Sequence, residues 1–256
     1  MPHNLSIGLN LAVGIPRSTV WTPLSLGSDL IAWWDADNGV SLSGSSVTSW
    51  ADRKAGYLAE QTLSGSRPLW SDTSFNGAPG ITFDGNDDEL TCIDSTLLST
   101  LPTGATAGEL WFVGQQNELA VAGALTRLAL AYSGADGFSR RSIGRGRPET
   151  VNRAIISYGI SGAVNVVVEP TVDFSSRHLV RGVIGNVETI YVDGGPGTSV
   201  AGTSTTSADR LRLGSSANTT ASAFWKGLIR DAIFTLPLST EKAALMQTWG
   251  LSRRML

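Results

Sequence analysis

The sequence predicts an all-β fold, and three observations support this prediction. From Leu30 onward, short apolar runs are separated by clusters of turn residues, which is typical of strands joined by tight turns. Only 16% of the 256 residues are charged and 29 are glycine, a balance that suits a turn-rich β protein better than a helical bundle. A chain of this length can form one large β-sandwich.

The expected strands follow one another along the chain. The apolar run Leu30–Trp34 ends at a turn-rich stretch, and in the next strand Val47 and Trp50 are expected to point toward a core. A two-residue turn at Gly185-Asn186 predicts a hairpin over residues 177–195. We expect Leu30–Trp34, Gly80–Phe83, Thr189–Val192 and Leu228–Phe234 to be strands in two packed sheets.

A helix is expected after the last strand, from Ser239 to about Trp249, and it should be the longest α-helix. Ser239 is a suitable N-cap because its hydroxyl can accept a backbone N–H of the first turn. Glu241 near the start and Arg253 and Arg254 near the end complement the helix dipole. Leu245 and Trp249 are four residues apart, so we expect both to be buried against a sheet.

Residues 1–28 differ from the rest and are interpreted as an extended N-terminal arm preceding a domain at 29–256. Apolar residues alternate with small or polar ones in this arm: Leu5, Ile7, Leu9, Leu11, Val13 and Ile15. Such a stripe needs cover, so we expect it to dock on another chain. Packing on its own domain and disorder are the alternatives. The segment lacks a basic residue before its apolar stretch, so it is not expected to be a cleaved signal, and the protein is expected to assemble in a cytoplasm.

Charge is distributed unevenly. Residues 1–120 carry 13 acidic and 4 basic groups, a net of −9, whereas residues 121–256 carry 9 acidic and 15 basic groups, a net of +6; the sum is the chain's −3. Either the two halves pair within one fold, which is the favoured interpretation, or neighbouring copies attract one another.

Several classes of site lack their residues. The single Cys92 rules out an internal disulfide, and with only His3 and His178 as histidines the chain cannot supply the usual zinc ligands. No apolar run is long enough for a membrane span. We therefore expect no cofactor and no membrane partner.

A series of short motifs carries a resemblance to a fold family. They are Trp-Trp-Asp-Ala at 33–36, Trp50 with Asp52, Arg67-Pro68, Asn-Gly-Ala-Pro at 76–79 and Phe-Asp-Gly-Asn-Asp-Asp at 83–88, followed by Ile-Tyr-Val-Asp-Gly at 190–194 and the closing strands and helix. In this order they resemble laminin-G-like domains with the concanavalin A-like jelly-roll β-sandwich. The resemblance covers about residues 29–252 and implies a fold more than a function, because this fold carries lectins, hydrolases and structural modules.

The arm carries a second resemblance. The Gly/Leu-rich leader followed by Trp21-Thr22-Pro23 resembles the start of bacteriophage minor virion proteins. This implies a structural component of a virion, such as a tail or head fibre, spike or decoration protein. Its partners would be other virion proteins held through the arm, and it would be a homo-oligomer, with a trimer as one option. A glycan-binding, lectin-like module that recognises a host surface is the alternative function.

Two clusters of polar residues are candidate binding sites. Asp35 and Asp37 could bind a metal while Trp33 and Trp34 stack on sugar rings, but we favour a core tryptophan and carboxylates that accept backbone N–H groups at a turn. The second cluster has four carboxylates within six residues: Asp84, Asp87, Asp88 and Glu89. Calcium is one interpretation, but the spacing differs from a calcium loop, so we favour an acidic turn with side-chain to backbone bonds.

Enzymatic chemistry is not expected. No strand carries alternating carboxylates, since Glu109, Glu118 and Glu169 each stand alone, and hydrolytic pairs need a defined separation. His178 is the one histidine of the domain, and we expect no Ser or Cys within hydrogen-bond reach of it. We therefore predict no catalytic residues and no metal ligands, and leave the binding residues open.

An arginine-rich segment lies near the middle of the chain, with Arg140, Arg141, Arg145, Arg147 and Arg153. Aromatic residues are not interleaved with them and the whole chain is acidic, so nucleic acid is not an expected partner. A solvated loop and a surface for an acidic protein or a neighbouring subunit remain as interpretations.

Overall fold

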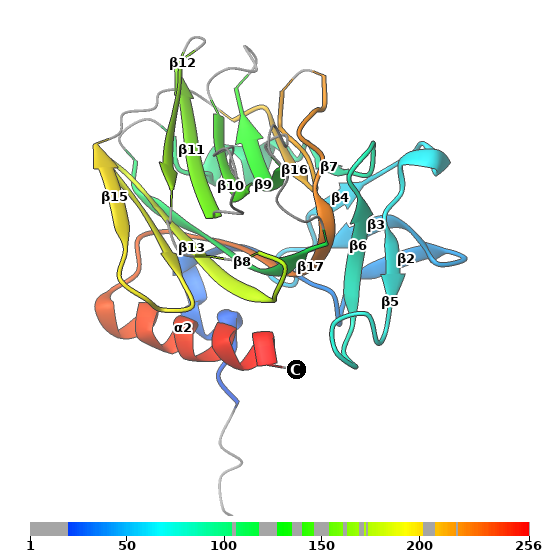
Figure 1. Cartoon of the computed structure of the whole chain (residues 1–256), viewed down its shortest axis with the longest axis horizontal. Coiled ribbons are helices and arrows are strands. Elements are labelled where there is room, and N and C mark those ends of the chain that lie inside the picture. The colour runs from blue at the N-terminus through cyan, green and yellow to red at the C-terminus, as the bar shows by residue number, and fades with distance from the viewer. Residues whose placement is uncertain are drawn as a thin grey trace, which may run out of the picture.

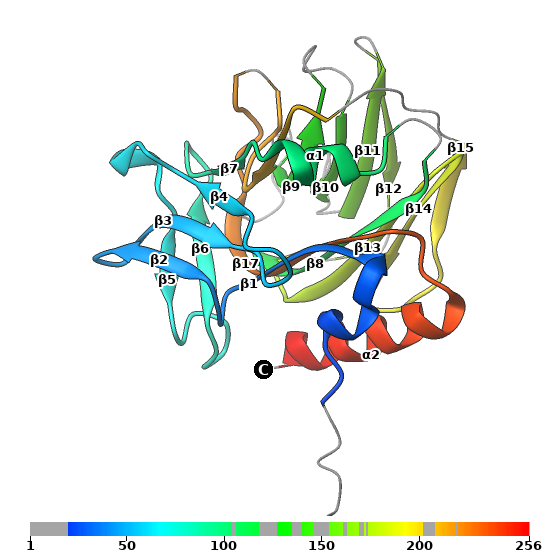
Figure 2. The same ribbon diagram turned by 180° about the vertical axis from the view of Figure 1, so that it is seen from behind.

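The computed structural model describes residues 20–103, 106–117, 127–134, 140–145, 154–160, 163–168, 172, 174–201, 208–218 and 220–255. Two curved layers of strands face each other, with a smaller group of strands at one end (Figures 1 and 2). All pairings between the named strands of the described residues are antiparallel. The all-β sandwich predicted from the sequence is confirmed.

The elements fall into four groups. One layer consists of β1 (Leu30–Asp35), β17 (Lys226–Thr235), β8 (Gly108–Gln116), β13 (His178–Ile184), β14 (Val187–Val192) and β15 (Thr198–Ala201). The opposite layer consists of β7 (Leu90–Cys92), β16 (Arg210–Leu213), β9 (Arg127–Ser133), β10 (Arg140–Arg145), β11 (Ala154–Ile160) and β12 (Ala163–Val168). The end group consists of β2 (Val40–Ser43), β3 (Ser46–Ala51), β4 (Leu58–Glu60), β5 (Leu69–Ser71) and β6 (Gly80–Asp84). The helices are α1 (Ser95–Thr100), α2 (Thr240–Met255) and the short 3₁₀ segments η1 (Pro23–Asp29) and η2 (Ser64–Ser66).

The main core lies between the two layers and takes apolar side chains from both. Phe112 and Ile190 come from one layer, and Leu211 and Ile143 come from the other. Helix α2 lies on the outer face of the β8–β17 layer (Figure 1). A second apolar cluster lies between the helix and that layer. The strands expected at Leu30–Trp34, Gly80–Phe83, Thr189–Val192 and Leu228–Phe234 are all present, within β1, β6, β14 and β17. Val47 and Trp50 are buried as predicted.

Helix α2 is present but packs through a different face from the one predicted. It runs from Thr240 to Met255, and the backbone N–H of Lys242 donates to Oγ of Ser239 at 3.3 Å, which confirms the N-cap. Met246 is fully buried, whereas Leu245 is 41% exposed, so the prediction for Leu245 is wrong. Trp249 is only partly buried, with its ring edge-on to Trp33 at 5.4 Å between centroids.

The face of α2 that packs on the sheet contains Gly250, which is buried with Ala243 and Met246. A Cβ atom at Gly250 would lie 2.6 Å from Cδ1 of Leu179 on β13, so a larger residue here would require the Leu179 side chain to shift. Small residues therefore decide the buried face, and the four-residue spacing of Leu245 and Trp249 does not. None of the helices in the described parts of the chain is both long and apolar enough to cross a membrane.

The acidic and basic halves of the sequence pair within one fold. Ion pairs join the first half to the second at Asp29–Lys242, Asp35–Arg253, Asp37–Arg230, Glu89–Arg212 and Glu109–Arg181. The intramolecular interpretation of the charge asymmetry is therefore confirmed for these groups.

The described part of the N-terminal segment starts at Val20, so the six alternating apolar residues of the arm lie outside the described residues. Between Trp21 and Asp29 the chain packs on the domain. Leu26 is buried and Trp21 contacts the same apolar cluster as α2. The docking of residues 1–19 on another chain stays a prediction.

Candidate functional site

Both tryptophans of the opening stretch belong to the interior. Trp33 and Trp34 are buried, and their indole N–H groups are satisfied inside the fold. Nε1 of Trp33 donates to Oδ1 of Asp231 at 3.0 Å, and Nε1 of Trp34 donates to the carbonyl oxygen of Trp50 at 2.9 Å. Stacking of these rings on sugars is therefore ruled out in this fold, and the structural interpretation is confirmed.

The carboxylates beside them are held by arginines. Oδ1 of Asp35 accepts the backbone N–H of Asp37 at 3.0 Å, as expected of a turn. Arg53 donates to Oδ2 of Asp35 at 2.7 Å, and Arg253 donates to its Oδ1 at 2.6 Å. Arg253 also reaches the fully buried Asp231, with 2.9 Å between Nε and Oδ2. These contacts fasten the end of α2 to β1 and β17, so we assign this cluster to stability.

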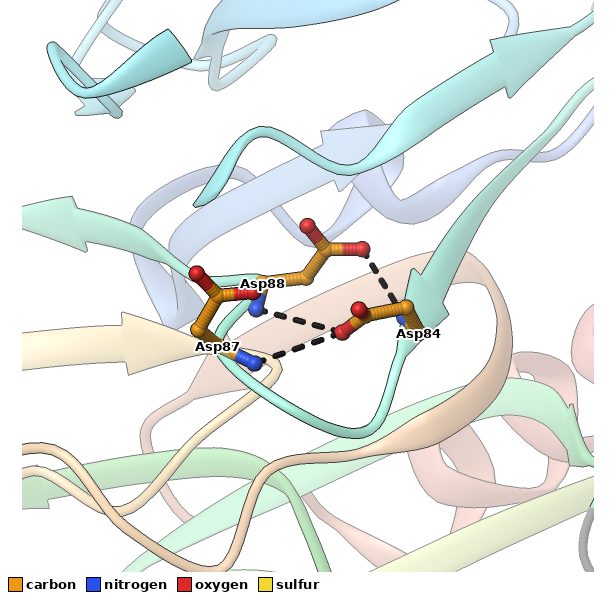
Figure 3. A group of neighbouring side chains, drawn as sticks. All are labelled: Asp84, Asp87 and Asp88. Carbon is orange, nitrogen blue, oxygen red and sulfur yellow. Dashed lines mark hydrogen bonds between the residues drawn. The ribbon is translucent and has the colours of Figure 1, made fainter. Parts of the chain in front are cut away.

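The acidic turn between β6 and β7 is organised around its own backbone (Figure 3). Oδ1 of Asp84 accepts the N–H groups of Asn86, Asp87 and Asp88, and Oδ2 of Asp88 accepts the N–H of Asp84 at 2.8 Å. Ligand oxygens of Asp84, Asp87 and Asp88 lie within 4.8 Å of one another. The predicted bonding between side chains and backbone is confirmed, and calcium at this turn stays an untested alternative.

The pKa values of Asp84 and Asp88 are shifted in opposite directions. Burial, together with the charges of Asp84 and Asp87, raises the pKa of Asp88 to about 6, although the N–H of Asp84 opposes the shift. For Asp84, burial is outweighed by the N–H groups that it accepts, so its pKa is lowered. Glu89 does not belong to this group of carboxylates. It accepts a hydrogen bond from Oγ of Ser215 at 2.6 Å and pairs with Arg212.

The other carboxylates considered for catalysis do not form a pair in the described residues. Glu109 is buried and takes a two-point hydrogen bond from Arg181, at 3.0 Å from Nε and 2.8 Å from Nη2. Its Oε1 also accepts the backbone N–H of Leu238 at 3.2 Å. Glu118 and Glu169 lie outside the described residues.

The arginine-rich segment is partly a strand of the core. Arg141 and Arg145 lie on β10, and both are buried, with Arg141 paired to the buried Glu188 of β14 in the opposite layer. The interpretations as a solvated loop or an exposed docking surface are therefore wrong for these two residues. They point the same way as the core residue Ile143, because alternate residues of a strand share a face. Arg140 belongs to the same strand, and Arg147 and Arg153 lie outside the described residues.

Residues of β4, β7 and α1 line a groove. Helix α1 is seen in the view of Figure 2. One depression of about 410 Å³ is lined by Ala55, Gly56, Tyr57, Leu58, Glu60, Thr91, Ile93 and Asp94. A second, of about 510 Å³, is lined by Ile93, Ser95, Leu98, Ser99, Thr103, Ala208 and Asp209. The two share Ile93, whose side chain is 73% exposed. We call the two depressions together the Ile93 groove.

The Ile93 groove combines fixed polar groups with apolar surface. Oδ1 of Asp94 accepts the backbone N–H groups of Thr96 and Leu97, at 2.9 and 3.0 Å, which orients its carboxylate at the start of α1. Burial and the charges of Asp94 and Asp52 raise the pKa of Tyr57, so its phenol stays neutral and can donate a hydrogen bond. The described lining includes three carboxylates and no Lys or Arg. Nothing in the local sequence marks this groove as a site.

The prediction for His178 is wrong. Oγ of Ser176 lies 2.9 Å from Nε2 of His178, and Oδ2 of Asp193 lies 2.7 Å from Nδ1 of the same ring. Ser176 lies in the bend just before β13, which begins at His178, and its hydroxyl meets the imidazole there. The β13–β14 hairpin brings Asp193 to them, since the N–H of Asp193 donates to the carbonyl oxygen of Leu179 at 2.8 Å and the N–H of Leu179 donates to Oδ1 of Asp193 at 2.9 Å.

Comparisons with known proteins place the fold. No family model matches the chain, and no curated protein matches it either. Among solved structures, domain 4 of AbnA, an extracellular GH43 arabinanase from Geobacillus stearothermophilus in complex with arabinotriose, is similar at a TM-score of 0.57 and 12% identity, covering 88% of this chain and 98% of that one. The CBM40 of a Ruminococcus gnavus sialidase bound to sialyllactose is similar at 0.51 and 10%, covering 66% of this chain and 96% of that one.

A larger protein also shares the fold over part of its length. A Trypanosoma rangeli sialidase in complex with sialic acid is similar at a TM-score of 0.58 and 14% identity, covering 89% of this chain and 33% of the sialidase. The present chain thus corresponds in size to about one third of that protein. At such identities the likeness establishes a shared fold, which these glycan-active proteins and their domains also use.

Proposed function

We propose that this chain is a glycan-binding domain that holds a neutral oligosaccharide in the Ile93 groove. The observation that carries the proposal is the make-up of that groove, in which an aromatic ring, an exposed aliphatic side chain and several hydrogen-bonding groups surround one concave strip. Sugars present apolar ring faces edged by hydroxyl groups. A site that binds them needs apolar contact together with fixed polar partners.

Individual residues of the groove suit these needs. The ring of Tyr57 and the side chain of Ile93 offer apolar contact, and the Tyr57 hydroxyl can donate to a sugar oxygen. The carboxylates of Glu60 and Asp94 accept hydrogen bonds from sugar hydroxyls, and a charged acceptor makes the stronger bond. The helix-capping role of Asp94 fixes its position before a ligand arrives, which lowers the entropic cost of binding.

Charge favours neutral over acidic glycans. The described groove residues include the carboxylates of Glu60, Asp94 and Asp209 and no cationic side chain, so a carboxylate-bearing sugar such as sialic acid would be repelled. Among proteins of the same fold, the arabinanase domain is in complex with arabinotriose, a neutral sugar, and this supports the same ligand class.

The proposal includes no cleavage of glycosidic bonds. A retaining or inverting glycosidase needs two carboxyl groups facing each other across the bound sugar. The close carboxylates Asp84, Asp87 and Asp88 share a single turn and accept its own N–H groups. Asp35 and Asp231 are both bound by Arg253.

Titration calorimetry with arabinotriose and other neutral oligosaccharides, against sialyllactose, tests the proposal. We expect a neutral sugar to bind, and Tyr57→Ala and Glu60→Gln each to weaken binding by roughly tenfold. Leu63→Ala is the matched control, because Leu63 is 67% exposed and does not line the groove. Unchanged affinity in both groove variants, or selective binding of sialyllactose, would overturn the proposal.

A role in a virion is a second proposal, favoured by the N-terminal segment. Trp21 and Leu26 fasten this segment to the cluster beneath α2, while Val20, where the described chain begins, is 83% exposed. Deletion of residues 1–19 tests this proposal. The shortened chain should stay folded, with an unchanged unfolding midpoint, and should fail to join assembled particles; normal incorporation would contradict it.

A further inference from the structure

We propose that Ser176, His178 and Asp193 form a hydrolytic triad that cleaves small carboxylic esters, an activity separate from the proposed glycan binding. The three side chains are linked in the order that nucleophilic catalysis requires, with Oγ to Nε2 at 2.9 Å and Nδ1 to Oδ2 at 2.7 Å.

The direction of each hydrogen bond follows from the charge on Asp193. Burial opposes its ionisation, but the hydrogen bonds from His178 and from the N–H of Leu179, together with the charges of His178 and Arg254, outweigh that effect and lower its pKa. An ionised carboxylate can only accept, so Nδ1 of His178 carries the proton that it shares with Asp193. When the ring carries only the Nδ1 proton, Nε2 is an acceptor and the hydroxyl of Ser176 can donate to it. This is the tautomer of a general base.

The base and its partner are held on rigid backbone. Oδ1 of Asp193 accepts the N–H of Leu179 at 2.9 Å, and the N–H of Asp193 donates to the carbonyl oxygen of Leu179 at 2.8 Å. The imidazole of His178 also packs edge-on against the buried ring of Phe174, with 5.5 Å between centroids. Ser176, in contrast, is exposed, so a substrate can reach its hydroxyl.

The reaction balances with water as the second substrate. Oγ of Ser176 attacks the ester carbonyl carbon while Nε2 of His178 takes the hydroxyl proton. The bond from carbon to the alkoxy oxygen then breaks, and the alcohol leaves with that proton. Water gives a proton to Nε2 and attacks the acyl carbon, and the carboxylic acid departs as Ser176 recovers its proton.

The exposed position of Ser176 indicates the substrate class. A nucleophile at the surface suits a small acyl group carried on a larger or soluble alcohol, and p-nitrophenyl acetate is therefore the first probe. Ser176→Ala should reduce its hydrolysis by at least about 100-fold, and Asp193→Asn, which can still accept the N–H of Leu179, by at least about tenfold. Ser175→Ala is the matched control and should hydrolyse the ester normally.

A covalent label separates catalysis from a structural hydrogen-bond chain. Diisopropyl fluorophosphate should add to Ser176, as read from the mass of its peptide, and the adduct should be absent in Ser176→Ala and strongly slowed in His178→Gln. All variants should keep the circular dichroism spectrum of the native chain, and Ser176→Ala should bind glycans unchanged. Equal ester hydrolysis by Ser176→Ala, or no adduct on the folded native chain, would overturn the triad.

Discussion

Nε of Arg253 lies 2.9 Å from Oδ2 of Asp231, so the last turn of α2 is joined to a fully buried carboxylate in the middle of β17. The same guanidinium reaches Asp35 and Asp37 at the end of β1. One side chain therefore ties together two strands and the C-terminal helix.

Replacing Arg253 should destabilise the fold strongly. Arg253→Met removes the guanidinium that hydrogen-bonds the buried Asp231 and leaves Arg230, 4.0 Å away, as its cationic partner among the described residues, and loss of one member of a buried pair costs roughly 3–5 kcal/mol. Chemical denaturation measures this change. Arg254→Met is the control, because Arg254 pairs with Asp193 in a partly exposed setting and should cost less than about 1 kcal/mol. Equal losses in the two variants would show that Asp231 does not depend on Arg253.

The turn at Asp88 should make stability depend on pH. The unfolded chain releases this proton near the ordinary pKa of 3.8, whereas the folded chain keeps it until about pH 6. The folded state is therefore favoured below pH 4, and that contribution is lost as pH rises to 6, by up to roughly 3 kcal/mol.

Asp88→Asn isolates this contribution, because an amide oxygen can still accept the N–H of Asp84 but does not titrate. Between pH 4 and 6, the stability of the native chain relative to the variant should fall. Urea unfolding in the presence of EDTA at several pH values measures the difference and keeps metal ions out of it. Parallel curves for the two proteins would contradict the assignment.

The face of α2 that packs on the sheet can be tested with neighbouring residues. Met246→Ala removes a fully buried side chain and should cost roughly 2–5 kcal/mol. Leu245→Ala should cost less than about 1 kcal/mol, since Leu245 is largely exposed. Trp249→Ala should lie between them, because its ring is partly buried against Trp33. If thermal or urea midpoints fall more for Leu245→Ala than for Met246→Ala, the helix packs through the face expected from the sequence.

Breaking the core ion pair between β10 and β14 should lower the free energy of unfolding strongly, whereas replacing both of its members should lower it little. Arg141→Met alone leaves Glu188 buried without Arg141 and should lose roughly 3–5 kcal/mol. The double variant Arg141→Met, Glu188→Leu removes both charges and should recover most of that loss. Unfolding free energies from a double-mutant cycle measure the coupling, and additive losses would show that the two residues do not support each other.

Much of this fold follows from the sequence alone. Alternation and turn residues located β1, β6, the β13–β14 hairpin and β17, because local chain geometry controls both patterns. The start of α2 was marked by Ser239, a local signal of the same kind. The uneven charge distribution indicated pairing between the two halves of the chain, but not which residues would pair.

The tertiary structure decided where side chains meet. Helix α2 packs on the sheet through the face that carries Gly250, because close approach of helix and sheet depends on the residue opposite, here Leu179. From the sequence alone Arg141 is expected at the surface, but in the fold β14 places Glu188 opposite it across the core. Ser176 and His178 are close in sequence, but the hairpin supplies Asp193, and strands distant in sequence form the Ile93 groove. Such sites depend on contacts between residues far apart in the chain, and the local sequence does not encode these contacts.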